Sequence, residues 1–378
     1  MTDAEKVILA RITERGVPIT FAEFMDLALY HPQYGYYNQV EQKIGREGDY
    51  YTSVHVSSLF GQAVARQLLE MGSILGWNGL KLVEYGAGEG YLALDILDAF
   101  GRSFPPSLGQ IPYYIVERSG YHRRQQQRRL EDYAGQVHWV EELSEVNQGK
   151  PFKGIVFSNE LVDAFPVHRV KQVEGQLKEI YVDNVNGSLV DKLGELSRPR
   201  LKEYFPSLDF ALEEGQEAEI NLNALEWLEE VGRYLEKGFV LTIDYGYEVG
   251  ELAHPRRFDG TVMCYYRHQA DANPYDRIGL KDITSHVNFT ALMKYGQKLG
   301  LEVTGFTNQM RFLVGLEAGK ELENPELTPM ERQKLALALK ELVMPDRMGE
   351  RFRVLIQHKG LTEKPDLAGL KGFGSCSR

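Results

Sequence analysis

Residues 80–100 read LKLVEYGAGEGYLALDILDAF and decide the fold. The apolar residues that open this stretch predict a strand buried on both faces, which should end at Glu84 and the glycines that follow it. Apolar side chains then recur three and four residues apart and predict a helix that packs back on the strand. These helical positions are Leu92, Leu94, Ile96, Leu97 and Phe100. The stretch therefore predicts a strand, a glycine-rich turn and a helix.

The turn contains three alternating glycines, Gly86, Gly88 and Gly90. Glycine permits a positive φ and lets a ligand approach the bare backbone, although a glycine turn without a ligand is the alternative. The preceding acid, Glu84, would repel a pyrophosphate seated on the helix N-terminus and would attract a cation. A dinucleotide site would also need glycine or alanine where this chain has Tyr91. The turn therefore favours a cationic ligand and argues against a nicotinamide dehydrogenase.

The spacing Glu84-x-Gly86-x-Gly88-x-Gly90 resembles motif I of the class I S-adenosylmethionine-dependent methyltransferases. The cofactor of these enzymes carries an amino acid and a sulfonium and has no phosphate. The resemblance therefore implies that the glycine turn binds S-adenosyl-L-methionine.

The composition is that of a globular protein with an acidic balance. The 378 residues include 43 Lys and Arg against 54 Asp and Glu, and the net charge of −11 opposes binding to nucleic acid. Two cysteines, Cys264 and Cys376, are too few for a disulfide framework or a structural zinc site. His268 and His286 lack the spacing of metal ligands, so we expect no metal. The sequence carries no secretion, transit or membrane-spanning signal, so we expect a cytoplasmic protein without a membrane partner.

An acid follows the second predicted strand, Tyr113 to Val116. In a doubly wound sheet, an acid at this place receives the ribose hydroxyls, typically roughly 20 residues beyond the glycines. Glu117 lies 27 residues beyond Gly90, and a proline-containing loop between them explains the excess. We therefore expect Glu117 to bind the ribose, with a solvated acid at a strand end as the alternative.

The third predicted strand, Val137 to Val140, also ends in acids, and Glu141 or Glu142 could reach the adenine amino group. The run RRQQQRR at 123–129 invites a nucleic-acid interpretation. On a helix, however, its basic side chains spread around the cylinder, and Glu131 and Asp132 follow at once. We therefore interpret the run as a solvated helix face.

The fourth predicted strand, 154–157, leads into SNELVDAFP at 158–166. Ligands of open α/β sheets bind beyond the carboxyl ends of the strands, so Asn159, Glu160 and Asp163 should lie where a transferred methyl group emerges. In a short helical turn Glu160 and Asp163 would share one face and could bind a guanidinium in bidentate fashion. The alternative is that Asn159 or Asp163 only caps the turn.

A tyrosine-rich loop, GDYYTS at 48–53, precedes the helix that leads to the first strand. Its carboxylate and hydroxyls, on Asp49, Thr52 and Ser53, could hold the ammonium and carboxylate groups of the cofactor's amino acid. Aromatic residues that simply pack under the loop are the alternative.

We expect the chain to close its sheet with two strands, Val303 to Phe306 and Met310 to Leu316, as an antiparallel hairpin at the edge, followed by a last strand at Phe352 to His358. The expected domain plan is an N-terminal helical and loop cover over 1–58, a Rossmann-like core over 59–170 and 219–360, an inserted β-rich substrate lobe over 171–218, and a flexible tail over 361–378.

Several stretches together resemble the MidA-like methyltransferase family, and they are FMDLALYHPQYGYY, GDYYTS, EYGAGEG, SNELVDAFPVHR, LTIDYGY, GTVMCYYRH and DITSHVNFTAL. The resemblance covers most of the chain, although Asn288 stands where many relatives have aspartate. It implies the class I α/β fold, with a mostly parallel seven-stranded sheet. It also implies that Glu84 and the three glycines form the cofactor loop, and that Asn159 and Glu160 begin the active-site signature. The mitochondrial members are complex I assembly factors that methylate an arginine.

These observations predict a methyltransferase that uses S-adenosyl-L-methionine, with a protein arginine as the methyl acceptor. Two alternatives stay open: an assembly factor that binds the cofactor without turnover, and a methyltransferase for small molecules. The sequence leaves the oligomeric state undetermined.

Overall fold

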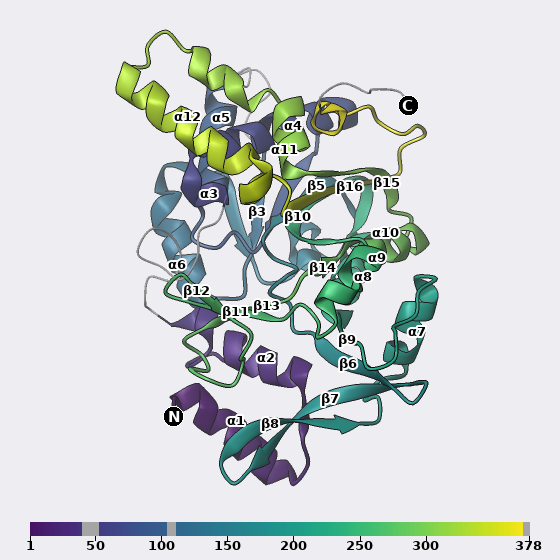
Figure 1. The fold of residues 1–378 in the computed structure, drawn as a ribbon. Coiled ribbons are helices and arrows are strands. Elements are labelled where there is room, and N and C mark those ends of the chain that lie inside the picture. The colour runs from purple at the N-terminus through teal and green to yellow at the C-terminus, as the bar shows by residue number, and fades with distance from the viewer. Residues whose placement is uncertain (40–52, 104–110, 373–378) are drawn as a thin grey trace. The chain divides into compact units, whose positions relative to one another are not determined.

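The computed structural model describes residues 1–39, 53–103 and 111–372 (Figure 1). The chain contains two compact units. The first unit comprises residues 1–50, 162–227 and 246–295, and the second comprises 51–161, 228–245 and 296–378. This grouping differs from the expected domain plan, which placed 246–295 in the core. The reason is packing: Ile278 and Ile283 share a buried cluster with the N-terminal helices, and Tyr37 donates a hydrogen bond of 2.8 Å to Asp282.

The second unit is built on a central sheet in the order β15-β16-β10-β5-β2-β3-β4. Strands β10, β5, β2, β3 and β4 are mutually parallel, whereas β16 is antiparallel to both β10 and β15. The fold class is therefore the predicted one, a mostly parallel sheet with an antiparallel edge pair. The strands are β2 Lys81–Tyr85, β3 Tyr113–Val116, β4 Val137–Val140, β5 Phe152–Asn159, β10 Leu235–Tyr247, β15 Glu302–Asn308 and β16 Phe352–Lys359.

Helices precede, connect and follow these strands within the described part of the chain. They are α3 Ser53–Val56, α4 Ser58–Leu75, α5 Tyr91–Ser103, α6 Gly120–Arg129, α8 Leu222–Tyr234, α10 Phe289–Lys298, α11 Gln309–Gly315, α12 Pro329–Val343 and α13 Ala368–Lys371. Short helical turns add η3 Glu131–Tyr133, η4 Leu143–Asn147, η6 Ala318–Glu323 and η7 Pro345–Gly349. No helix in the described ranges is both long enough and apolar enough to span a bilayer.

The strand order reverses between β2 and β5, which are hydrogen-bonded neighbours. Ligands of open α/β sheets bind beyond the carboxyl ends of the strands at such a switch point. The chain leaves β2 at Gly86 and leaves β5 at Glu160, so the sheet brings the glycine turn and the predicted acceptor site to one edge.

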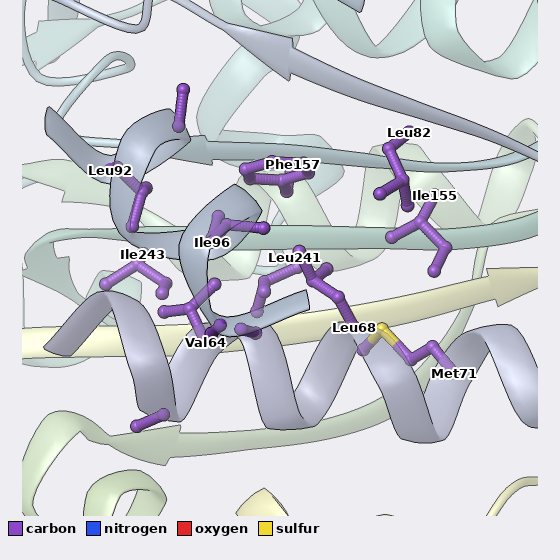
Figure 2. Close-up of a cluster of buried hydrophobic side chains, with 14 of the residues drawn as sticks. Val64, Leu68, Met71, Leu82, Leu92, Ile96, Ile155, Phe157, Leu241 and Ile243 are labelled. Atoms are coloured by element: carbon purple, nitrogen blue, oxygen red, sulfur yellow. The ribbon is translucent and has the colours of Figure 1, made fainter. Parts of the chain in front are cut away.

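A hydrophobic core lies between this sheet and its helices (Figure 2). Helices α4 and α5 and strands β2, β5 and β10 each contribute fully buried aliphatic or aromatic side chains. Those labelled in Figure 2 are Val64, Leu68, Met71, Leu82, Leu92, Ile96, Ile155, Phe157, Leu241 and Ile243. The apolar face predicted for the helix after the glycine turn is thus the face that packs on the sheet.

Two expectations for the C-terminal part are wrong. Met310 to Leu316 does not form the second strand of a hairpin, because α11 covers 309–315, with Asn308 capping it through Arg311 N, and β15 pairs with β16 instead. The stretch 361–372 is also not a flexible tail. Leu367 is fully buried, and Gly369 N donates a hydrogen bond of 3.2 Å to Gln67 in α4.

The first unit contains an antiparallel sheet in the order β1-β7-β6-β9, with β8 paired to β7. Its strands are β1 Ile19–Thr20, β6 His168–Val173, β7 Gln176–Val185, β8 Ser188–Gly194 and β9 Glu217–Ile220. A second sheet has the order β12-β11-β13, from Gln269–Asp271, Met263–Tyr266 and Asp282–Thr284, and β14 Val287–Asn288 pairs with the end of β10. The helices are α1 Asp3–Arg15, α2 Phe21–Tyr30, α7 Pro199–Ser207 and α9 Val249–Leu252, with turns η1 Tyr36–Asn38 and η5 Pro255–Arg257.

Candidate active site

The glycine turn has the backbone geometry that its sequence predicts. Gly86, Gly88 and Gly90 have φ of 62°, 52° and 86°, a region that residues with a Cβ rarely adopt. A Cβ on Gly86 would lie 2.6 Å from Leu161 Cδ1, and one on Gly90 would lie 3.4 Å from the Cα of Gln126. A Cβ on Gly88 would meet no atom of the described residues within 4 Å. The space beside Gly86 and Gly90 is therefore filled by the protein's own atoms, whereas the space beside Gly88 is open to a ligand.

The acid before the turn, Glu84, is buried in the second unit. Its carboxylate accepts a hydrogen bond of 2.6 Å from the hydroxyl of Tyr113, and 2% of the residue is exposed. Burial, which disfavours the charged form, raises the pKa of Glu84 to about 7, and the hydrogen bond from Tyr113 opposes this shift. A positive charge brought near this carboxyl would favour its ionised form.

Glu117 lies directly after β3, where the ribose acid was predicted. Its carboxylate accepts hydrogen bonds from Ser119 N at 2.8 Å and from Gln126 Nε2 at 3.0 Å, and Nδ1 of His122 lies 3.9 Å away. Burial raises the pKa of Glu117 to about 7, although these hydrogen bonds oppose the shift. An oriented, buried carboxylate is a suitable acceptor for two ribose hydroxyls.

The two acids after β4 have different environments. Glu142 serves as a cap, because its side chain accepts from the backbone of Glu145, and Glu145 in turn accepts from the backbone N–H groups of both acids at 2.8 and 2.9 Å. The side chain of Glu141 is 73% exposed and lies 3.8 Å from Nη1 of Arg123. Of the two acids predicted to contact the adenine, Glu142 is engaged as a cap, whereas the side chain of Glu141 is exposed and can still reach a ligand.

At the end of β5, Asn159 and Glu160 lie together as predicted. The N–H of Glu160 continues the hydrogen bonding between β5 and β10 by donating a hydrogen bond of 2.9 Å to Ile243 O. The backbone of Glu160 then adopts a φ of 54°. Its Oε1 accepts hydrogen bonds from Asn159 Nδ2 at 3.0 Å and from Ser53 N at 3.4 Å. Asn159 Oδ1 is buried, without a hydrogen-bond partner among the residues described. Positive φ in a non-glycine residue is costly and clusters at functional sites.

Asp163 does not share a helical turn with Glu160, so this part of the prediction is wrong. The left-handed residue Glu160 and the hydrogen bond of 3.1 Å from Leu161 N to Asp244 turn the chain out of helical geometry. Asp163 belongs to the first unit, is 6% exposed, and offers its backbone carbonyl to Ser285 N at 2.9 Å.

The loop candidates can be placed only in part. Asp49 and Thr52 lie outside the described residues. Ser53 is the first residue of α3 and is fully buried. Its hydroxyl lies 3.0 Å from Gln309 Oε1, an acceptor, so the hydroxyl proton is donated within the protein. Ser53 thus supports Glu160 through its backbone, a role the sequence did not indicate.

The interpretation of residues 123–129 as a solvated helix face is wrong for one side of α6. Gln126 is fully buried and donates a hydrogen bond of 2.8 Å to Gly88 O. Arg129 Nη1 donates to Glu89 O at 2.5 Å. The only available signal was the three-residue spacing of Arg123, Gln126 and Arg129, which places these residues on one side of a helix.

The chain matches, over residues 62–307, the family described as "Putative S-adenosyl-L-methionine-dependent methyltransferase". This match covers more than half of the sequence. The chain belongs to this family. It is an S-adenosyl-L-methionine-dependent methyltransferase, as the resemblance of its glycine turn to motif I implied.

Several known proteins are similar to this methyltransferase over most of its length. A Burkholderia thailandensis protein, solved with bound S-adenosyl-homocysteine, has 31% identity and a TM-score of 0.85, with 97% of this chain and 94% of that chain covered. The Drosophila melanogaster "Protein arginine methyltransferase NDUFAF7 homolog, mitochondrial" is 27% identical, with 94% of this chain and 85% of the relative covered. The human "Protein arginine methyltransferase NDUFAF7, mitochondrial" is also 27% identical, with 94% and 83% covered.

The residues at the sheet edge fit S-adenosyl-L-methionine. Gly88 leaves space on the bare backbone, and Glu117 presents an oriented carboxylate that suits ribose hydroxyls. Two buried carboxyls, on Glu84 and Glu117, suit a cofactor that is positively charged.

Proposed function

We propose that this methyltransferase transfers its methyl group to the guanidinium of an arginine in a protein substrate. The observation that carries the proposal is the held carboxylate of Glu160 at the carboxyl end of β5, beside the glycine turn. The names of the fly and human relatives support it, since both are called protein arginine methyltransferases. We also propose that the protein acts in the cytoplasm.

Glu160 suits a cationic acceptor because its carboxylate is already oriented. Ser53 N and Asn159 Nδ2 both donate to Oε1, so the carboxylate cannot rotate freely. A guanidinium is protonated at all ordinary pH values and presents a planar fork of donors that matches a carboxylate. Binding to Glu160 would hold the positive charge on the nitrogens that face it and leave the remaining nitrogen toward the methyl group. That nitrogen would lose one proton as it gains the methyl group, so the product would again be a singly charged guanidinium.

The bound cofactor supplies an electrophilic methyl group on a sulfonium. The chain's own contribution to the transfer is mainly the relative placement of the two reactants, which can supply roughly 7–11 kcal/mol of the barrier. We assign the placement of the cofactor to Glu84, Gly86, Gly88, Gly90, Glu117 and Glu141. Ser53 is assigned to the support of Glu160 instead. The expected role of Asp49 and Thr52 stays a prediction from the sequence. Asn159 and Glu160 place the acceptor, and Asp163 receives no role in this proposal.

The proposal is tested by incubating the full chain with tritiated S-adenosyl-L-methionine and a cell extract, followed by acid hydrolysis of the labelled proteins. We expect label in methylarginine, and we expect Glu160→Gln to lower this labelling at least about 100-fold because the guanidinium loses its ion pair. Cofactor affinity should stay within about twofold of wild type. Glu350→Gln, on an exposed residue of the second unit, is the matched control.

Other outcomes identify the alternatives. Label in metabolites without labelled protein would make the protein a small-molecule methyltransferase. Cofactor binding without any labelled product would favour an assembly factor without turnover. Full labelling by Glu160→Gln would remove Glu160 from the mechanism.

A further inference from the structure

One side of helix α6 contacts the loops that follow three neighbouring strands of the sheet. Arg123, Gln126 and Arg129 lie three residues apart on this side, and their partners lie after β2, β3 and β4. We propose that this side of α6, with Gln126 at its centre, is the positioning element of the cofactor site. The proposal concerns the cofactor alone and is independent of the identity of the methyl acceptor.

The amide of Gln126 links the glycine turn to the ribose acid. Its Nε2 donates to Gly88 O at 2.8 Å and to Glu117 Oε2 at 3.0 Å, and its Oε1 accepts from Trp139 Nε1 at 3.0 Å. The orientation of the amide follows from chemistry, because the indole can only donate and the carbonyl can only accept. The two amide hydrogens are thus shared between Gly88, where the backbone faces open space, and Glu117, which is predicted to bind the ribose.

Arg129 holds the next carbonyl of the same turn. Its Nη1 donates to Glu89 O at 2.5 Å and lies 3.5 Å from Glu89 Oε2. The guanidinium carbon also lies 3.4 Å from the ring centroid of Tyr91, the first residue of α5. Arg129 therefore fixes the junction between the turn and the helix by a hydrogen bond and a cation–π contact. This gives a role to Tyr91, the residue that argued against a dinucleotide site.

Arg123 connects the same helix to the loops that follow β3 and β4. Its Nη2 donates to Glu117 O at 3.2 Å, and its Nη1 lies 3.8 Å from Glu141. Side chains of one helix thus bind the backbone carbonyls of Gly88 and Glu89 in the glycine turn. They also bind both the backbone carbonyl and the carboxylate of Glu117. A site that is held in its binding geometry before the ligand arrives loses less free energy on ordering. Helix α6 therefore sets the distance between the glycine turn and the ribose acid.

The test compares Gln126→Met and Arg129→Gln with two neighbours on the exposed side of α6, Gln127→Met and Arg128→Gln. Binding of S-adenosylhomocysteine to each full-length variant is measured by calorimetry, and folding is checked by thermal unfolding. We expect Gln126→Met to weaken binding about tenfold or more, because a hydrogen bond to a carboxylate is lost. We expect Arg129→Gln to weaken it about threefold or more, and both controls to stay within about twofold.

A second ligand separates positioning of Glu117 from a general structural role. The 2′-deoxy analogue of S-adenosylhomocysteine lacks a hydroxyl that Glu117 would accept. Wild type should bind this analogue clearly more weakly than the parent ligand, whereas Gln126→Met should discriminate between the two by less than about threefold. Arg129→Gln should keep the wild-type discrimination, because it acts on the glycine turn and leaves Glu117 in place.

Two results would overturn the proposal: unchanged affinity in folded Gln126→Met, or an equal loss for both ligands, which indicates a merely structural role. If Gln126→Met does not fold, the shorter amide in Gln126→Asn carries the same expectations. It keeps the polarity but cannot reach Gly88 and Glu117 at once.

Discussion

The hydroxyl of Tyr113 donates a hydrogen bond of 2.6 Å to the carboxylate of Glu84, and both side chains are buried. Glu84 is the last residue but one of β2, the strand that leads into the glycine turn, so an acid whose ionisation is costly lies just before this turn. The pKa of Glu84 is raised to about 7 by burial, and that of Tyr113 is raised by burial and by the neighbouring carboxylate.

Tyr113→Phe should destabilise the protein more at high pH than at low pH. Above about pH 8 Glu84 is ionised, and a hydrogen bond to a charged carboxylate contributes about 1.5–3 kcal/mol to the free energy of unfolding. Near pH 5.5 the carboxyl is protonated, and the variant loses a neutral hydrogen bond that contributes only about 0.5–1.5 kcal/mol. Urea unfolding at both pH values measures the difference, with Tyr114→Phe on the same strand as the control. An identical loss at both pH values would contradict the ionisation of Glu84.

Glu84→Gln should stabilise the cofactor-free protein at pH 8 and have little effect at pH 5. A carboxyl whose folded pKa is about 7, above its unfolded value, binds more protons in the native state, so native stability falls as pH rises from about 4.5 through 7. The neutral amide of the variant avoids this loss of stability, about 1–3 kcal/mol at pH 8. Its oxygen still accepts the hydrogen bond from Tyr113. The same variant should bind S-adenosyl-L-methionine more weakly. Urea midpoints and calorimetry check the two halves of this prediction.

Cofactor binding should release protons near neutral pH. The cationic ligand favours the ionised forms of Glu84 and Glu117, whose pKa values are both raised to about 7 in the protein alone. Tyr113, His122 and Arg123 are the neighbouring groups that face these acids. Affinity should therefore rise between pH 6 and 8.

Calorimetry of S-adenosyl-L-methionine binding in phosphate and in Tris at pH 7 measures this release. The two buffers have different ionisation enthalpies, so their observed heats should differ if protons leave. Equal heats would show that the buried acids keep their protonation state. S-adenosylhomocysteine, which lacks the sulfonium charge, should release fewer protons.

Gly88→Val should abolish cofactor binding in a protein that still folds. The new side chain would occupy the space beside the turn, and a φ of 52° adds about 1–3 kcal/mol of strain. Gly79→Val is a matched control, because Gly79 has a φ of 71° and also no neighbour within 4 Å in the described chain, but lies outside the turn. Normal binding by folded Gly88→Val would refute the assignment of the cofactor loop, and loss of binding in both variants would trace the effect to strain.

The sequence alone determined the fold class and the loops that carry the site. Alternation of apolar runs with helical periodicity is a local property, so the strands at β2, β3 and β4 could be predicted, and acids and glycines at their carboxyl ends follow from the topology. Positive φ at Gly86, Gly88 and Gly90 is likewise a local requirement. Glu117 and Glu160 were therefore found at their expected places.

Tertiary structure alone decided what holds these residues. From the sequence, Gln126 and Arg129 were expected to be solvated, because they lie in a run of polar residues. Burial of a polar side chain depends on partners that are far away in the sequence, here the carbonyls of Gly88 and Glu89. The helical turn expected around Asp163 gives way to a left-handed residue, since Glu160 N–H is already bonded to the neighbouring strand. The conversion of 310–316 into a helix has the same cause: β16, from the distant C-terminal region, pairs with β15 instead. Local sequence patterns predict secondary-structure elements and allow more than one backbone conformation. Hydrogen bonds to distant strands of the sheet determine which of these conformations forms.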